Sequence, residues 1–573
     1  MRILVTDAHE LAGLGAVRSL GKAGHRVIAG YPSRLPPPAS TYSRYCDTRR
    51  AYPDPWVSQP AFCQWLIANA PDVDLVLPIS EAALVAAVSC RSQLPAQALV
   101  APATAALEYT LSKCRATAKA LALGIACPRT AFSLEGVPEV KSPWIVRTDN
   151  RLADDGSYRK GRTWYVEDSS ELMELLRELT EEGEQWLVQE HIVGKGGGAF
   201  LLMRRGQTVL EFAHERLHEV PFYGGVSSLR RSVRDDATVA TATQLFAAIG
   251  YEGAGMFEFR RSHLDQVAYF IEINGRLWGS LALALHAGAD FPAKLVESHA
   301  GAVAPPAPGG YTTGIYCRNV YPGETDYLRS VLTVSGPVRG VQPPRKAQAL
   351  LEFLTLFFTP RMHYDYFWLS DPLPWVRESI RACIHVVKSR WSTWIGKRRQ
   401  QRLLREFADK RAQDVPDLRR VLFVCYGNIC RSAFAGAYWN QSGSLPSARS
   451  VGFHVQANRR TPPRISRLAK EFGVDLAGHR SSVVDFEAVE QATAIFVMDG
   501  QNTEDLLQAF PQARPKTWLL GPFGGVHAID DPYLLPEAEA RASLQQVKQS
   551  VDGVVGCLTS SANAARSGAG AHE

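Results

Sequence analysis

The sequence predicts a multidomain protein in which α/β and α+β domains follow one another along a single chain. Its 573 residues and 46% hydrophobic content are enough for several domains, each with its own core. Apolar strands alternate with helical stretches in the first hundred residues, the pattern of an open α/β sheet. A further apolar strand near residue 421 opens a separate α/β region, and no internal repeat is visible. We therefore expect domains of unrelated fold.

Composition limits the classes of protein to which the chain can belong. The net charge of +6 is small for this length and gives no reason to expect nucleic-acid binding. Ten cysteines are scattered without metal-ligand spacing, and a reactive cysteine needs a reducing compartment. Residues 1–6 enter a strand without a signal-peptide pattern, and no apolar run reaches the roughly 20 residues of a membrane span. We expect a cytoplasmic protein.

The first predicted domain, residues 1–105, is an open α/β sheet. Gly13 and Gly15 follow the first strand, but the G-x-G-x-x-G fingerprint of dinucleotide sites is incomplete. A strand-to-helix turn eased by glycine is the favoured interpretation. The expected elements are strands at 3–6, 26–29 and 75–78 and a helix at 12–23.

Two later strands each present a carboxylate from an apolar background. If these strands are neighbours, Glu258, Glu272 and Asn274 converge as the oxygen ligands that Mg²⁺ prefers, with Mn²⁺ as an alternative. Arg276 would then stabilise charge on a transferred phosphoryl group or on an acyl phosphate. The opposing interpretation makes each glutamate a surface residue of an edge strand.

These strands belong to a longer series of motifs. The E-x-N-x-R pattern ends at Arg276, and the other motifs are Lys113 and residues 123–128, 185–192, 194–198 and 219–227. In this order they resemble the ATP-grasp superfamily, specifically the carbamoyl-phosphate-synthase-like carboxylate–amine ligases, over residues 1–330. The resemblance implies a pre-ATP-grasp domain at 1–105 and an ATP-grasp domain at 106–330, whose two α+β lobes clamp ATP. Members make an acyl phosphate from a carboxylate and ATP, then transfer the acyl group to an amine or another nucleophile.

The resemblance also implies which residues contact ATP. The family commonly has a lysine on the strand that here reads Trp-Ile-Val-Arg-Thr, and Arg147 keeps its charge without the compact ammonium geometry. Lys160, in a glycine-flanked stretch, is an alternative contact to the phosphates. We expect ATP binding and leave turnover open. The expected ATP-binding residues are Lys113, Arg147, Lys160, Gln189, Glu190, His191 and Ile192.

The carboxylate and amine substrates are not identified by the sequence. Polar side chains precede the Gly224–Gly225 loop and are candidates for a substrate pocket, and an exposed polar β-ribbon explains them equally well. These side chains are His214, Arg216, His218 and Glu219, followed by Arg230 and Arg231. The candidate substrate residues are Arg216, Arg230 and Arg276.

Residues 331–418 are predicted to form a helical, partly basic connector. Residues 350–358 are an apolar run with the length of a core helix. From residue 376 a helical stretch leads into a basic segment. We favour a solvated helix that bridges two enzymes, and peripheral contact with an anionic membrane is the alternative. The segment contains Trp391, Trp394, Lys397, Arg398, Arg399, Arg402 and Arg405.

The apolar strand at 421–424 delivers Cys425 into a loop that ends at Arg431. Gly427 and Asn428 can take the positive φ angles that curl the backbone into a ring of N–H groups around a phosphate. The positive end of a following helix favours the thiolate form of Cys425, which would attack phosphorus. The guanidinium of Arg431 can grip two phosphoryl oxygens. The predicted phosphate-binding loop is Tyr426, Gly427, Asn428, Ile429, Cys430 and Ser432.

About a hundred residues later, Asp531 precedes Pro532 and is the candidate general acid. The pattern V-C-x-G-N-x-C-R-S followed by D-P-Y resembles the low-molecular-weight protein-tyrosine-phosphatase family over residues 419–558. This resemblance implies a phosphocysteine mechanism with Cys425 as nucleophile, Arg431 as phosphate clamp and Asp531 as acid and then base. A phosphotyrosine protein or a small aryl phosphate is the expected substrate.

Two departures qualify this resemblance. Ala433 stands where the family usually has proline, and this difference removes no catalytic group. Related arsenate reductases use a further cysteine pair downstream, but no cysteine lies between Cys430 and Cys557, so arsenate reduction is disfavoured. Cys430 is either a partner for a protective disulfide with Cys425 or a small buried thiol.

Together the motifs predict a bifunctional ligase and phosphatase. The alternative is an active phosphatase that a non-catalytic, nucleotide-binding ATP-grasp module regulates or targets. A phosphotyrosine reader is disfavoured because the candidate catalytic residues are intact. Residues 559–573, rich in alanine, serine and glycine, are predicted to be a disordered tail.

Overall fold

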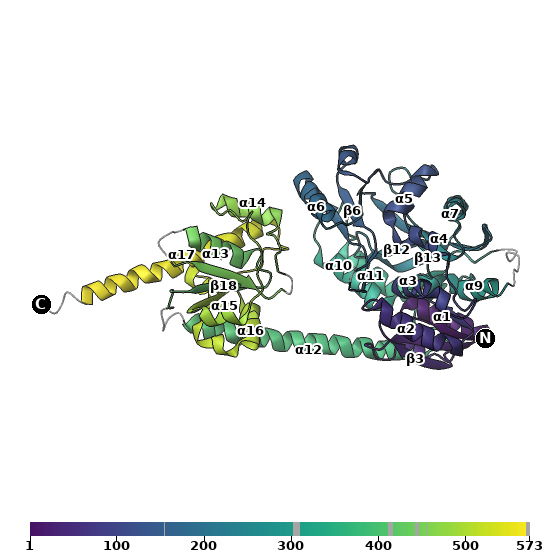
Figure 1. Ribbon diagram of the computed structural model, residues 1–573, viewed down its shortest axis with the longest axis horizontal. Coiled ribbons are helices and arrows are strands. Elements are labelled where there is room, and N and C mark those ends of the chain that lie inside the picture. The colour runs from purple at the N-terminus through teal and green to yellow at the C-terminus, as the bar shows by residue number, and fades with distance from the viewer. Residues whose placement is uncertain (154, 302–309, 411–415, 442–445, 455–456, 569–573) are drawn as a thin grey trace. The chain divides into compact units, whose positions relative to one another are not determined.

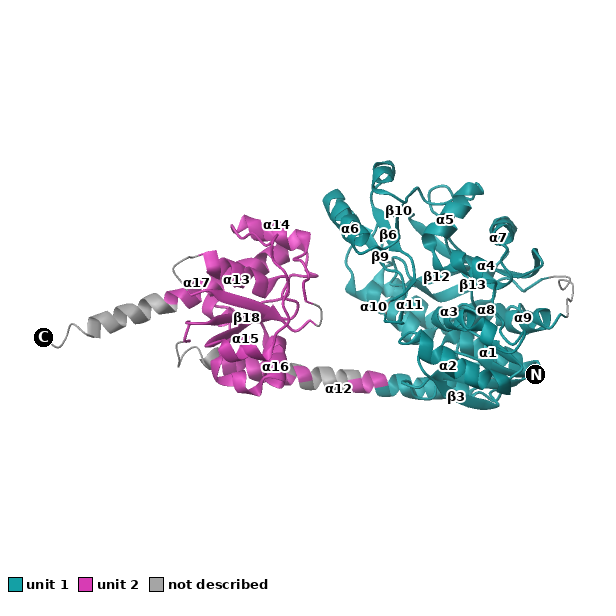
Figure 2. Cartoon of the chain, viewed as in Figure 1, with its two compact units in different colours: residues 1–384 teal, residues 385–573 magenta. Residues whose placement is uncertain are grey.

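The computed structural model describes residues 1–573 except 154, 302–309, 411–415, 442–445, 455–456 and 569–573. The side chains of 389–395, 397, 408–410 and 557–568 are also not described, so Trp391, Trp394, Lys397 and the predicted tail lie outside the described side chains. The chain divides into two compact units, residues 1–384 and 385–573 (Figure 2). Every helix in the described part is too short or too polar to cross a membrane.

Unit 1 opens with a parallel sheet of strand order β3-β2-β1-β4, which agrees with the predicted open α/β sheet and adds β3 to the three strands expected. Residues 3–5 of β1 are fully buried because both neighbouring strands and the flanking helices cover them. Gly13 permits the first strand-to-helix turn, since a Cβ there would lie 2.6 Å from the carbonyl oxygen of Asp7. The strands are β1 (Arg2–Val5), β2 (Arg26–Pro32), β3 (Thr48–Tyr52) and β4 (Leu75–Leu77), and the helices are α1 (Leu11–Lys22), α2 (Gln59–Asn69) and α3 (Glu81–Ser89).

A smaller sheet of order β5-β10-β6-β9 follows, and all its pairings are antiparallel. Helix α6 (Ser169–Glu181) buries Leu172, Leu176 and Leu179 against it, and its Asp168 cap accepts hydrogen bonds from the first turn. The elements are α4 (Thr104–Leu111), α5 (Lys113–Ala122), β5 (Thr130–Ala131), β6 (Trp144–Thr148), the hairpin β7 (Arg151–Leu152) and β8 (Tyr158–Arg159), β9 (Thr163–Val166) and β10 (Trp186–Glu190).

The largest sheet, which contains β12 and β13 (Figure 1), has the order β15-β14-β11-β12-β13-β16-β17. Strands β14 and β15 are antiparallel neighbours with Glu258 directly opposite Glu272, so the predicted adjacency of the two carboxylate strands is observed. The elements are β11 (Gly194–Arg204), β12 (Gln207–Val220), β13 (Val226–Val233), α7 (Asp236–Ala248), β14 (Gly253–Ser262), β15 (Ala268–Asn274), α8 (Leu281–His286), α9 (Phe291–His299), β16 (Tyr316–Arg318) and β17 (Met362–Tyr364).

The predicted connector is divided between the two units. Strand β17 pairs with β16, so residues 331–384 are part of unit 1. The apolar run 350–358 is not a core helix, because only one side of it faces the protein: Leu351 is 63% and Phe358 87% exposed. The elements here are α10 (Thr325–Thr333), α11 (Lys346–Thr355), η6 (Leu356–Phe358) and α12 (Leu373–Lys410).

Unit 2 contains a parallel sheet of order β19-β18-β20-β21 with helices on both faces. The central strand β18 is fully buried, and Leu403 and Phe407 of α12 pack into the same core. The elements are β18 (Val421–Cys425), α13 (Arg431–Gln441), β19 (Ala448–Gly452), α14 (Pro463–Glu471), α15 (Phe486–Gln491), β20 (Ala494–Val497), α16 (Gly500–Ala509), β21 (Thr517–Leu519) and α17 (Glu537–Gly568).

Candidate active sites

In unit 2, the loop between β18 and α13 curls around the sulfur of Cys425. The backbone N–H of Asn428 donates to Cys425 Sγ over 3.2 Å, and Ser432 Oγ lies 3.0 Å from the same sulfur. Asn428 has a φ of +51°, whereas Gly427 does not have the positive φ that the sequence suggested. The sulfur is therefore held by hydrogen-bond donors at the N-terminus of a helix, an arrangement that favours negative charge.

Asn428 also fixes the shape of this loop through its side chain. Its Nδ2 donates to the hydroxyl oxygens of Ser432 and Ser450 over 3.0 Å each, and its Oδ1 accepts the N–H of Ser482 over 2.8 Å. His479 Nε2 lies 2.7 Å from the carbonyl oxygen of Asn428. Ser450, Ser482 and His479, which lie far from the loop in the sequence, thus hold it in place.

Arg431 is buried beneath the loop, with only 2% of its side chain exposed. One terminal nitrogen donates to Asp499 Oδ2 over 2.6 Å and to the carbonyl oxygen of Ile529 over 2.8 Å. The other donates to Asp531 Oδ2 over 2.9 Å. The structure therefore brings together Cys425, Arg431 and Asp531, the residues that the resemblance implies as nucleophile, phosphate clamp and acid. It adds Asp499, whose only sequence signal is its position just after β20.

Cys425 and Asp531 line a pocket of about 330 Å³. Tyr426 and Tyr533 are half-exposed at its edge, and Tyr426 packs edge-on against His454. Burial raises the pKa of the Cys430 thiol, and Cys425 and Cys430 are both free cysteines. The protective disulfide considered from sequence is therefore not formed in this structure. The pocket is lined by Cys425, Tyr426, Gly427, Ile429, Cys430, His454, Arg459, Asp531 and Tyr533.

Comparison with known proteins identifies this domain. Residues 420–564 match the family model of low molecular weight phosphotyrosine protein phosphatase. The chain is 31% identical over 137 residues to a protein-arginine-phosphatase of Geobacillus stearothermophilus, covering 91% of that protein and 23% of this chain. Through its C-terminal domain, the chain belongs to the low molecular weight phosphotyrosine protein phosphatase family. A putative tyrosine phosphatase of this class from Klebsiella pneumoniae is 28% identical over 130 residues, 90% of its length and 23% of this chain.

Besides this phosphatase domain, the chain has a second and larger cleft in unit 1, with a volume of about 760 Å³. It is walled by the small sheet on one side and by the large sheet on the other, together with the segment before α10. The predicted residues that line it are Arg147, Lys160, Gln189, Glu190, His191, Ile192, Arg216, Arg230, Glu258, Glu272, Asn274 and Arg276.

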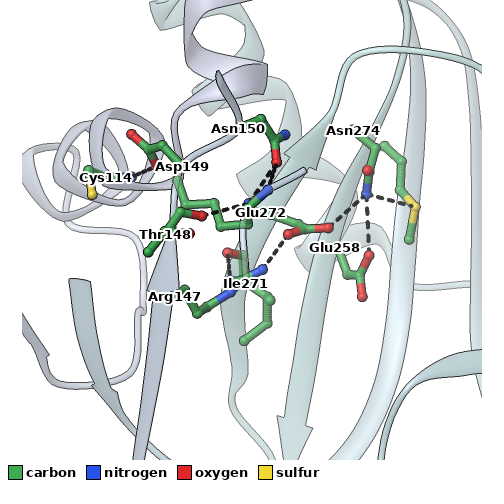
Figure 3. A network of polar contacts seen from close by, with 12 residues as sticks. Cys114, Arg147, Thr148, Asp149, Asn150, Glu258, Ile271, Glu272 and Asn274 are labelled. Atoms are coloured by element: carbon green, nitrogen blue, oxygen red, sulfur yellow. Dashed lines mark hydrogen bonds and ion pairs between the residues drawn. The ribbon is translucent and has the colours of Figure 1, made fainter. Parts of the chain in front are cut away.

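The two predicted carboxylates and the asparagine converge in this cleft (Figure 3). Asn274 Nδ2 donates to Glu258 Oε2 over 3.3 Å and to Glu272 Oε1 over 3.4 Å. An arginine flanks each carboxylate: Arg216 lies 2.8 Å from Glu258, and Arg147 pairs with Glu272. Burial raises the pKa of Glu272, but Arg147, Lys113 and Lys160 outweigh it and hold that pKa below its ordinary value. Glu272 is therefore ionised.

Lys113 and Arg147 both lie near Glu272, but only Arg147 lines the cleft. Arg147 lines the cleft and donates to the carbonyl oxygen of Ile271 over 2.9 Å. The ammonium of Lys113 instead donates to the carbonyl oxygen of Thr148 over 3.2 Å and lies 3.4 Å from Asn150 Oδ1. Burial, followed by the charge of Arg147, lowers the pKa of Lys113. Lys113 is not among the residues that line the cleft.

At the hinge of the small sheet, the four consecutive residues from Gln189 to Ile192 face the same cleft. Gln189 is buried and donates to Thr130 Oγ1 over 3.2 Å, while Glu190 Oε1 accepts the N–H of Arg129 over 3.1 Å. Burial, with the nearby charges of Arg260 and Arg339, lowers the pKa of His191 to about 4. The imidazole of His191 is therefore uncharged where the hinge meets the cleft.

The predicted substrate residues separate into two groups. His214 and Trp278 line the cleft, and among the described residues both His214 ring nitrogens and Trp278 Nε1 are buried without a hydrogen-bond partner. Arg230 also lines the cleft but pairs with the buried Asp365. His218 and Arg231 lie outside the lining residues, because His218 pairs with Glu324 and Arg231 with Glu215. Trp278, next to Arg276, had no signal in the sequence.

Unit 1 also has similarity to solved structures. A biotin carboxylase in complex with β,γ-ATP from Campylobacter jejuni aligns with a TM-score of 0.44 at 18% identity, covering 55% of this chain and 74% of that protein.

Proposed function

We propose that the chain is a bifunctional enzyme, with a phosphatase site in unit 2 and an ATP-dependent ligase site in unit 1. The observation that carries the first half is that Cys425 and Asp531 line one pocket and that Arg431, at the end of the Cys425 loop, donates to Asp531. The second half rests on the convergence of Glu258, Glu272 and Asn274 in the large cleft.

In the phosphatase site, the phosphoryl group of the substrate accepts hydrogen bonds from the loop N–H groups and from Arg431. Cys425 Sγ attacks phosphorus and forms the S–P bond as the ester P–O bond breaks, and Asp531 gives its proton to the departing oxygen. Asp531 then takes a proton from water, which attacks phosphorus and breaks the S–P bond. Ser432 Oγ, 3.0 Å from the sulfur, stabilises the thiolate that leaves.

The edge of the pocket favours an aryl phosphate of a phosphotyrosine protein or a small molecule. Tyr426, Tyr533 and His454 supply aromatic surface for the leaving group. The homologous Geobacillus protein is named an arginine phosphatase, which makes phosphoarginine the second substrate to test. The guanidinium of phosphoarginine would be repelled by the cationic Arg459 in the pocket lining. Asp531 is the one carboxylate among the described lining residues that could attract it. Charge therefore favours phosphotyrosine.

The acid role of Asp531 is tested by leaving-group dependence. We expect Asp531→Asn to lower kcat by about 10²- to 10³-fold with phosphotyrosine and clearly less with p-nitrophenyl phosphate, because nitrophenolate needs less protonation. Asp552→Asn on α17, which removes an exposed partner of Lys548, is the matched control. An equal loss with both substrates would show that Asp531 acts in another way.

The unit 1 donor set fits Mg²⁺, or Mn²⁺, which binds oxygen ligands and keeps several positions for water and phosphate. No group of three or more His, Cys, Asp or Glu side chains with metal-binding geometry exists in the described part of the chain, so two carboxylates and one amide would hold the ion. When bound, the ion neutralises charge on ATP phosphates. The hinge from Gln189 to Ile192 would hold the adenine edge, and Arg147 and Lys160 would contact phosphates.

The partnerless nitrogens of His214 and Trp278 mark the end of the cleft where a carboxylate substrate would bind. Burial, with the charges of Arg216 and Arg230, lowers the pKa of His214 well below its ordinary value, so His214 is neutral and one ring nitrogen can donate. Arg276 lines the same region and would stabilise the acyl phosphate. An amine would then attack the acyl carbon and release phosphate.

Thermal unfolding tests nucleotide binding directly. We expect Mg²⁺ and ATP together to raise the Tm of the wild-type chain by several degrees, and Glu272→Gln to abolish that shift because it removes a charged oxygen ligand. Glu252→Gln, on the turn before β14, is the control and should keep the shift. The same shift in Glu272→Gln would exclude this ligand set.

The alternative of a non-catalytic nucleotide-binding module makes a different prediction. With Mg²⁺ and ATP, a ligase releases ADP only when both a carboxylate and an amine are supplied. A regulatory module binds ATP, changes phosphatase activity and releases no ADP. A panel of carboxylates and amines assayed for ADP release separates the two.

A further inference from the structure

Two helical segments of unit 1 present apolar side chains to solvent. On α11 and η6 the exposed positions follow helical spacing, so they form one stripe. The first turns of α12 continue the pattern with a spacing of three and four residues. We call these side chains, together with Leu369 in the turn before α12, the apolar face: Leu350, Leu351, Leu354, Phe358, Leu369, Leu373, Val376 and Ile380.

The apolar face is exposed although its helix is firmly attached. On the opposite side of α11 and η6, Ala349 is 2% and Leu356 8% exposed, because they pack against the rest of unit 1. Phe358 and Leu369, by contrast, are each 87% exposed. Large apolar side chains in such number on one surface mark an interaction site more often than chance exposure.

An apolar pocket of about 450 Å³ is lined in part by Phe357 of η6 and by Trp375 and other residues of the first turns of α12. Its walls are mostly aromatic, and Phe367 packs edge-on against Trp375 with ring centroids 5.4 Å apart. Phe357 and Phe367 line the pocket and neighbour Phe358 and Trp368 in the sequence. A pocket of this size and polarity fits part of an acyl chain.

The charges around the apolar face are mainly positive. Arg345, Lys346, Arg361, Arg377 and Arg381 lie on the same segment of chain. Its four acidic residues are all paired, and two of them are buried. Asp365 pairs with Arg230, Asp371 with Arg18 over 2.9 Å, Glu352 with His218 over 3.4 Å and Glu378 with Arg381 over 3.3 Å.

We propose that the apolar face binds the surface of an anionic lipid bilayer. Apolar and aromatic side chains flanked by arginine and lysine are suited to the interface between bilayer and water. The apolar side chains enter the acyl region, and the cationic side chains contact the anionic headgroups. A second copy of the chain fits less well, because pairing two such faces would bring their cations together. Phe358 and Leu369, the most exposed members, would enter the bilayer first.

The position of the pocket gives this contact a consequence for unit 1. The segment Val320–Glu324 (η5) separates the pocket from the large cleft: Val320 and Tyr321 line the pocket, whereas Pro322 and Gly323 line the cleft. Binding to a bilayer would therefore hold the large cleft next to the lipid surface.

Vesicle co-sedimentation of the full chain tests the proposal. We expect wild type to sediment with vesicles of phosphatidylglycerol and phosphatidylcholine, and little with phosphatidylcholine alone. Phe358→Ser with Leu369→Ser should weaken partitioning by about tenfold or more, because two large side chains no longer enter the bilayer. Leu264→Ser, at a 95% exposed position in the turn between β14 and β15, should bind like wild type. Arg345→Gln with Lys346→Gln should reduce the preference for anionic lipid.

Unchanged Tm values establish that the variants fold. The proposal is overturned if wild type does not bind anionic vesicles or if the double serine variant binds as wild type does. A wild-type dimer by light scattering that the double serine variant converts to a monomer, without vesicle binding by wild type, would likewise overturn it and assign the face to contact between copies.

Discussion

At the scale of single residues, the phosphatase site shows what local sequence can and cannot predict. The spacing of Cys425 and Arg431 is set within one loop, so the sequence places both at the same phosphate. Asp499 reaches Arg431 from the end of another strand, over 68 positions of sequence. A contact of that kind depends on the register of β18 and β20, which no local pattern reveals.

Asp499 is predicted to be a positioning residue for Arg431. We expect Asp499→Asn to lower kcat/KM for p-nitrophenyl phosphate by about tenfold to a hundredfold, mainly through KM, because Arg431 would lose its charged partner and its fixed orientation. Steady-state kinetics of the full chain measure the two constants separately. If kcat alone falls while KM is unchanged, Asp499 takes part in the chemical step and the positioning role is wrong.

At the scale of elements, the pairing and packing of segments far apart in the sequence decided which predicted helices and strands the structure confirms. The alternation of apolar residues was enough to predict β14 and β15, and their pairing brings Glu258 opposite Glu272. The run at 350–358 has the composition of a core helix, yet the protein covers only one side of it. Composition cannot tell whether a second element will cover the other side. His218, predicted near a substrate, instead joins β12 to α10 and α11 through Glu324, Tyr327 and Glu352.

This His218 contact predicts a pH dependence of stability. Burial lowers the pKa of His218, but Glu324 and Glu352 raise it from 6.5 to about 9. Because the folded pKa lies above the unfolded one, the stabilisation is complete below pH 6.5 and is lost as pH rises through about 9.

We therefore expect the stability advantage of wild type over His218→Gln to shrink by about 3 kcal/mol between pH 6.5 and 9.5. Differential scanning calorimetry of the full chain measures this difference. His263→Gln, at an exposed position, should follow the wild-type profile. A constant difference across that range would mean that His218 is not charged in the folded state.

At the scale of the whole molecule, the chain joins two compact units with separate pockets, one around Cys425 and one around Glu258 and Glu272. Each pocket is lined by residues of its own unit. The domain series could be predicted because each unit has its own ordered motifs. The bounds of the connector could not, since β17 joins the large sheet through pairing with β16.

Hydrolysis of p-nitrophenyl phosphate by three forms of the full chain tests the central claim most directly. Wild type should be active, Cys425→Ser inactive because the nucleophilic sulfur is gone, and Glu272→Gln as active as wild type because its residue belongs to the other site. Activity in Cys425→Ser at the wild-type level would contradict the phosphocysteine mechanism, and loss of activity in folded Glu272→Gln would contradict the independence of the two sites.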